Sequence, residues 1–268
     1  MTGFDYGNAR LRVRAASWLS AAGYRGLLAS SSVDGLLGSM AQLDYSDDVS
    51  ATMGRYQGIR RLDEAVRIHL SRQLSDVLSF YTGRIAGRLR THLSRWDLRN
   101  VRSILRGLAG RRQQTPGTAA LITAGAFDAR TLEEVAAQRD VRAAVDLLSV
   151  WGLPSPAVVR RLRHALPAFA ESGDVLVLEH ALDGALGELA SADHPEGDRV
   201  SELLARDVDR VNLMSLLRLR ADAGSNGPAS FGEPVAGGSV FPEVWTDLAA
   251  ADDTALVNEL PARVDRIW

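Results

Sequence analysis

Hydrophobic residues recur every three or four positions along most of the chain, and alternation with a period of two is nearly absent. Leu98, Val101, Leu105 and Leu108 show the pattern clearly, because together they would form one apolar stripe on a helix. The same periodicity predicts helices at residues 7–21, 33–43, 57–82, 84–110, 132–150, 155–169, 175–190 and 200–223, with Ser32 as an N-cap. The sequence therefore predicts an all-α fold.

One motif occurs twice within these helices. The pattern D-x-x-N-[VL]-x-S-[IL]-L-R stands at residues 97–106 and again at 209–218, an offset of 112 residues. LDEAV at 62–66 resembles LEHAL at 178–182, and scattered identities link residues 135–147 to 248–260 at an offset of 113. Such spacing indicates a duplicated helical module. We expect one helical lobe at 1–120, a second at 121–240 with the glycine-rich segment 223–239 as a linker, and an incomplete third at 241–268.

The repeated motif places polar residues where apolar ones are expected. Asp97 lies within the apolar stripe and Asn100 lies on its edge, and Asp209 and Asn212 repeat this arrangement. A carboxylate buried without a partner is strongly destabilising. We therefore expect each Asp to meet an arginine or to cap a neighbouring helix end, and we interpret all four residues as structural.

Composition excludes several classes of function. The 268 residues are 46% hydrophobic and 24% charged, which suits a soluble globular protein. The absence of cysteine excludes disulfides and thiolate metal sites, and all 31 basic residues are arginine, which excludes Walker A and Schiff-base chemistry. No signal peptide or membrane-spanning run is visible, so we expect a cytoplasmic location.

No pattern typical of an active site is present. The five histidines lack metal-ligand spacing, and neither a glycine-rich phosphate loop nor a nucleophile elbow occurs. The acidic pairs at 47–48 and 252–253 are expected to be solvated charges in polar turns. The sequence therefore predicts no catalytic residue, metal site or cofactor.

Charge is distributed unevenly along the chain. Residues 1–116 carry a net charge of +9 and residues 117–268 a net charge of −11, which suggests two different neighbours. Six arginines fall within roughly a 60° arc of one helix, opposite its apolar stripe, with no acidic residue between them. These residues, which we call the arginine ladder, are Arg84, Arg88, Arg95, Arg99, Arg102 and Arg106. An acidic surface of this protein or of a partner and plain solvation are both open explanations of the ladder.

The opening sequence YGNARLRVR, residues 6–14, together with the two D-x-x-N helices, resembles the family of C-type stalk subunits of V-type and A/V-type rotary ATPases and ATP synthases, called d-type in eukaryotes. This resemblance implies an all-helical funnel of three similar lobes. It further implies a non-catalytic central-stalk subunit that joins the central shaft, made of D- and F-type subunits, to the proteolipid ring on the cytoplasmic face of the membrane. The third lobe would be truncated here.

The resemblance makes Arg10, Arg12 and Arg14 candidate contacts to the ring or shaft, with the arginine ladder as the next candidate. A solvated helix face explains these arginines equally well. Two other functions stay open: a helical nucleic-acid-binding protein that uses the basic first half, and a helical-repeat scaffold with unrelated partners. Nucleic acid is less well supported, because aromatic residues are not interleaved with the ladder.

Overall fold

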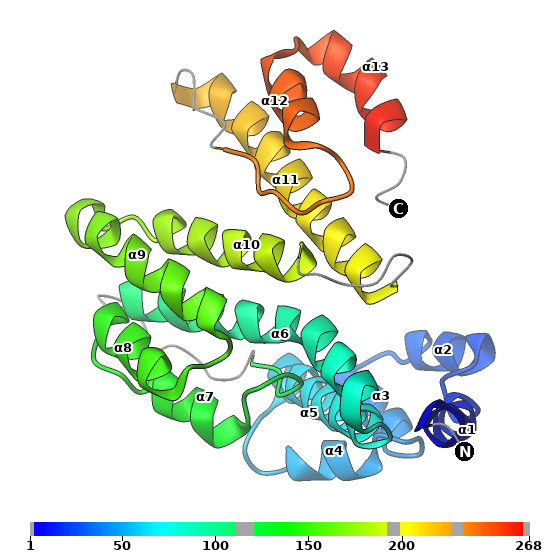
Figure 1. Ribbon diagram of the computed structural model, residues 1–268. Coiled ribbons are helices and arrows are strands. Elements are labelled where there is room, and N and C mark those ends of the chain that lie inside the picture. The colour runs from blue at the N-terminus through cyan, green and yellow to red at the C-terminus, as the bar shows by residue number, and fades with distance from the viewer. Residues whose placement is uncertain (1–2, 111–120, 192–198, 227–232, 265–268) are drawn as a thin grey trace. The chain divides into compact units, whose positions relative to one another are not determined.

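The computed structural model describes residues 3–110, 121–191, 199–226 and 233–264, and within these ranges it contains thirteen helices and no strand (Figure 1). The all-α prediction is therefore confirmed. The chain divides into two compact units, Met1–Asp140 and Val141–Trp268. Among the described residues, no helix combines the length and the apolar character that crossing a bilayer requires.

Unit 1 is built around two long helices that follow each other in the chain. Its helices are α1 (Gly3–Ala15), α2 (Ala21–Leu28), α3 (Val33–Met40), α4 (Ser46–Ala51), α5 (Gly58–Ser79), α6 (Gly83–Ala109) and α7 (Ala129–Ala136). The short helices α3 and α4 pack on α5, with Leu37, Met40, Val49 and Ala65 in their shared core. Helix α7 packs on α6. The long pair therefore positions the shorter elements of this unit.

The helix predicted at 7–21 is present but shorter, because α1 ends at Ala15 and a second helix begins after Ser20. The Ser20 hydroxyl accepts a hydrogen bond from the Gly23 amide at 3.1 Å, which caps α2. Ser32 caps α3 in the same way through the Gly35 amide, as predicted. The helix predicted at 132–150 is two helices, since residues 137–140 separate α7 from the next helix.

Unit 2 contains α8 (Val141–Trp151), α9 (Pro156–Ser172), α10 (Leu176–Ala190), α11 (Arg199–Asn226), α12 (Pro242–Ala250) and α13 (Asp253–Val264). Helix α10 packs extensively against both α9 and α11. Ser155 caps the start of α9, and Gly173 ends it with a φ of 68°, a conformation that favours glycine. The far end of the unit has its own core, in which Trp245 and Leu248 of α12 pack against Leu213 and Leu216 of α11.

The duplicated motif corresponds to a duplicated structural module. In unit 1, α6 is followed by an irregular loop at residues 121–127 and then by α7. In unit 2, α11 is followed by residues 233–240 and then by α12. Displacing Leu132 and Val135 of α7 by 113 positions gives Trp245 and Leu248 of α12, and all four are buried. Residues related by the 113-residue offset therefore occupy equivalent buried positions in the two units.

Candidate interface and the repeated Asp-Asn clamps

The first motif fastens the loop that follows α6. The Asn100 Nδ2 group donates to the Ile122 carbonyl at 2.8 Å, and its Oδ1 accepts from the Ile122 amide at 2.9 Å. The Asp97 Oδ2 atom accepts from the Ala126 amide at 2.8 Å. Asp97 and Asn100 are each 1% exposed. We call Asp97, Asn100 and loop 121–127 the first clamp.

The second motif repeats this geometry on α11. Asn212 bonds both the amide and the carbonyl of Val235, at 2.8 and 2.9 Å. Asp209 accepts from the backbone amides of Ser239 and Val240, at 2.9 and 3.1 Å, and from the Ser239 hydroxyl. Both side chains are buried. We call Asp209, Asn212 and residues 233–240 the second clamp.

Each clamp depends on a glycine that lies against its carboxylate. A Cβ atom on Gly125 would lie 2.0 Å from Asp97 Oδ2, and one on Gly238 would lie 2.1 Å from Asp209 Oδ1. These glycines are 113 residues apart, the offset that also relates Ile122 to Val235. The backbone can approach each Asp only because the glycine has no side chain.

The partners expected for the two Asp residues, an arginine or a helix end to cap, were wrong. Backbone amides, and not an arginine, bind both carboxylates among the contacts that the structure describes. The amides precede the N-caps of α7 and α12, which are Asp128 and Phe241, so neither carboxylate is a helix cap. Within the segment expected as a linker, residues 224–226 belong to α11 and residues 233–239 lie in the second clamp. Residues 227–232 lie outside the described ranges.

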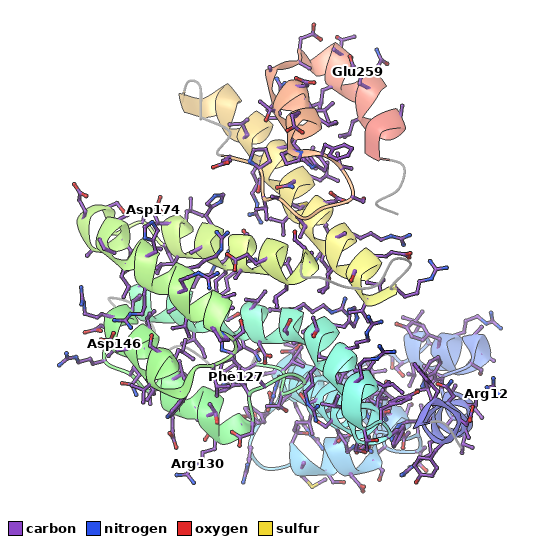
Figure 2. The ribbon with its side chains drawn as sticks, in the orientation of Figure 1. Arg12, Phe127, Arg130, Asp146, Asp174 and Glu259 are labelled. Carbon is purple, nitrogen blue, oxygen red and sulfur yellow. The ribbon has the colours of Figure 1, made fainter. Side chains whose placement is uncertain are left out.

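Burial makes the first carboxylate easier to protonate. Desolvation raises the pKa of Asp97 from 3.8 to about 6, although hydrogen bonds from the Ala126 and Phe127 amides favour the charged form. Phe127, labelled in Figure 2, is itself 3% exposed. Within the described part of the chain, no cation contributes to this shift. The first clamp therefore holds its loop through a carboxyl group whose charged form is destabilised by burial.

The three candidate arginines of α1 lie in different environments. The Arg10 guanidinium lies 4.4 Å from the Phe80 ring centroid and donates to the Tyr6 hydroxyl at 3.2 Å. Arg14 forms an ion pair with Asp76 at 2.8 Å. Arg12 is exposed. Arg10 and Arg14 therefore help to hold α1 on the end of α5, and Arg12 is presented to the exterior.

The arginines of the ladder fall into two groups by their exposure. Arg88, Arg95 and Arg102, spaced by seven residues, are half-buried, whereas Arg84, Arg99 and Arg106 are exposed. The guanidinium carbons of Arg95 and Arg99 lie 5.7 and 5.4 Å from the centroid of the Trp96 ring. The opposite face of α6 is buried. The three exposed arginines are therefore more accessible to a partner than the three half-buried ones.

A buried charged cluster in unit 1 was missed by the sequence analysis. Asp48 was expected in a solvated turn, but it lies on α4 and is 2% exposed. Its carboxylate bonds His69 Nδ1 and the Arg72 guanidinium, each at 2.8 Å, and these contacts hold its pKa below the usual value despite burial. Its partners, 21 and 24 residues further along the chain, are brought close only by the packing of α4 on α5. Asp252, in contrast, is exposed.

The described residues show no arrangement typical of catalysis. They contain no group of three metal-ligating side chains. A hollow of about 540 Å³ lies in unit 1 between α1, α2 and α5, and Leu11, Trp18, Leu43 and Val77 form part of its mostly apolar lining. The two clamps are structural elements, because each holds a loop against a long helix of its unit. The fold thus defines an all-helical protein with an internally repeated, loop-fastening module.

Comparison with known proteins identifies the family. The chain matches the ATP synthase (C/AC39) subunit family over residues 7–264, and it belongs to that family. It is 30% identical to the C subunit of the A-type ATP synthase of Halobacterium salinarum over 275 residues, covering 98% of this chain and 73% of the relative. It is 26% identical to the C subunit of the V-type ATP synthase of Deinococcus radiodurans, covering 98% of this chain and 73% of the relative. The A-type protein of Haloquadratum walsbyi is 26% identical over 88% of this chain and 67% of its own length.

Proposed function

We propose that this chain is a non-catalytic central-stalk subunit of an A/V-type rotary ATPase, coupling the central shaft to the membrane ring on the cytoplasmic face. Family membership over residues 7–264 is the observation that carries the proposal, and the relatives include C subunits of both A-type and V-type ATP synthases. Its partners would then be subunits of the rotary complex, with the D- and F-type shaft subunits and the proteolipid ring as the specific candidates.

A mechanical role is supported by the hydrogen bonds that hold a loop against a long helix within each unit. A part that transmits torque has to keep its shape under load, so its connecting loops cannot move freely. Here both described inter-helix loops of the repeat are fixed to a long helix by buried hydrogen bonds to the backbone. Because these bonds hold the loops in place, each repeat of the module acts as a stiff body.

The exposed arginines supply a surface for acidic partners. Arg12 on α1 and Arg84 and Arg99 on α6 are exposed in unit 1. A surface of this kind orients and accelerates association with a partner of opposite charge. We therefore assign Arg84 and Arg99 to the interface with the shaft or the ring.

Affinity purification from native membranes tests this function. The tagged chain should recover shaft and ring subunits, and changing Arg84 and Arg99 together to Glu should reduce that recovery. Arg130→Glu is the matched control, because Arg130 is 87% exposed on α7 and lies outside the proposed interface. Recovery of no rotary-ATPase subunit would overturn the proposal. Binding to DNA with a steep salt dependence and no such recovery would favour the nucleic-acid alternative.

A further inference from the structure

The first two helices of unit 1 expose an unusual number of large apolar side chains. Six such residues between positions 4 and 28 are 52–76% exposed: Phe4, Tyr6, Val13, Trp18, Tyr24 and Leu28. Four of the six are aromatic, and Phe241 is the one other exposed aromatic side chain in the described part of the protein. Helix α2 has no buried residue, and in residues 4–15 of α1 only Gly7 is fully buried. These side chains therefore do not serve the core of unit 1.

The same region is cationic without interruption. Between Tyr6 and Val33 the chain contains no Asp or Glu, but it contains four arginines. Three of them, Arg10, Arg12 and Arg25, are exposed, and Figure 2 shows Arg12 on the side of α1 that is turned away from α5. We call the outer faces of α1 and α2, with the bend at residues 16–20, the α1–α2 surface. It combines aromatic, aliphatic and arginine side chains, and Asp5 in the first turn of α1 is its one acidic residue among those described.

We propose that the α1–α2 surface binds directly to the headgroup region of an anionic lipid bilayer. Trp and Tyr side chains partition into this region, because their rings are apolar and each keeps a polar group in contact with water. Arginine pairs with lipid phosphates in a bidentate geometry. Anionic lipids attract juxtamembrane basic residues, and the lack of any carboxylate between positions 6 and 33 removes the opposing repulsion.

The placement of the apolar side chains favours a bilayer over a protein partner. Protein interfaces need complementary shape, usually with aromatic anchors in well-packed pockets. Of the six exposed side chains only Trp18 lines the hollow between α1, α2 and α5; the other five project from the outer faces of two consecutive helices. Figure 1 shows these helices, in blue, at one edge of unit 1. A fluid layer can accept such dispersed side chains, because it imposes no fixed shape.

Flotation with defined vesicles tests the proposal on the full chain. Vesicles of phosphatidylcholine with roughly 30% phosphatidylglycerol should carry the protein at about 50 mM salt, and vesicles of phosphatidylcholine alone should not. Changing Arg12 and Arg25 together to Gln should weaken binding about tenfold or more. Trp18→Ser combined with Tyr24→Ser should do the same. Phe241→Ser is the matched control, since Phe241 is 75% exposed in unit 2, and it should bind like wild type.

Several results would overturn the proposal. Absence of flotation with the anionic vesicles would do so, and so would equal binding by wild type and both double variants. A photoreactive residue at position 24 that crosslinks to an acidic protein in native membranes, without vesicle binding, would assign the surface to a protein partner instead. Recovery of rotary-ATPase subunits is measured separately on the same variants. Vesicle binding that persists while this recovery is absent would contradict the proposed function alone.

Discussion

The clamps make a quantitative prediction at Asn100. Truncation to Ala removes both hydrogen bonds to Ile122 and leaves the amide and carbonyl of that residue, which is 7% exposed, without their partner. Each buried backbone group left without a partner costs about 1–3 kcal/mol, so Asn100→Ala should lower the free energy of unfolding by about 2–6 kcal/mol. The loss should concentrate on loop 121–127, because the bonds act there.

Urea unfolding and hydrogen exchange measure the two parts of this effect. Exchange of backbone amides in residues 121–127 should accelerate in Asn100→Ala, while residues 233–240 of the second clamp keep their protection. Ser94→Ala is the control, since Ser94 is half-buried on the same helix and its hydroxyl bonds the Thr91 carbonyl within that helix. It should change stability by less than about 0.5 kcal/mol.

Asn100→Asp separates the hydrogen bonds from the volume of the side chain. The charged carboxylate still accepts from the Ile122 amide but repels the Ile122 carbonyl, so the variant should be destabilised at neutral pH. Below the pKa of the new side chain, its hydroxyl can donate to that carbonyl and stability should recover relative to wild type. If Asn100→Ala leaves both the unfolding midpoint and the exchange of the loop unchanged, the clamp does not hold the loop and the reasoning fails.

Three further predictions concern individual residues of the two clamps. Ala126→Ser should raise the unfolding free energy by about 1–2 kcal/mol in urea, because its hydroxyl would bond Asp97 as the Ser239 hydroxyl bonds Asp209; a decrease would show that the clamps are not equivalent. Since the pKa of Asp97 is raised to about 6, its contribution to stability is complete below pH 3.8 and is lost as the pH rises through 6. Relative to Asp97→Asn, wild type should therefore gain about 2 kcal/mol between pH 7.5 and 4.5, and parallel profiles would contradict this. Gly238→Ala should cost about 1–3 kcal/mol in thermal unfolding, because its Cβ would meet Asp209, and an unchanged Tm would mean that the loop approaches less closely.

Long helices were predictable from the sequence, and short breaks were not. The stripe of Leu98, Val101, Leu105 and Leu108 located α6 to within a residue or two, because its burial on one side imposes the helical period. The bend between α1 and α2 was missed, since residues 16–20 are small or amphipathic and do not interrupt the pattern. There the Ser20 cap decides the boundary, and a single serine gives only a weak signal.

The clamps were predictable in part. The repeated motif identified Asp97, Asn100, Asp209 and Asn212 as polar residues on apolar faces, and all are buried. Their partners were not identified, because backbone amides have no signature in the sequence. The glycines at 125 and 238 carried the missing information, since they share the 113-residue offset and stand where only a bare backbone fits. Contacts such as Asp48 with His69 depend on how α4 packs on α5, which periodicity does not specify.

The clamps bind the main chain of their loops and depend little on its side chains. Ile122 in the first loop corresponds to Val235 in the second, and Ala126 to Ser239, yet the backbone amides of all four residues bond the long helix of their unit in the same way. After a duplication, the exposed side chains of the loop can therefore change to suit a different binding partner. The Asp, the Asn and the Gly of the clamp have to stay at the same spacing. Because only these three residues are constrained, copies of the module can acquire different binding partners and keep the same backbone structure.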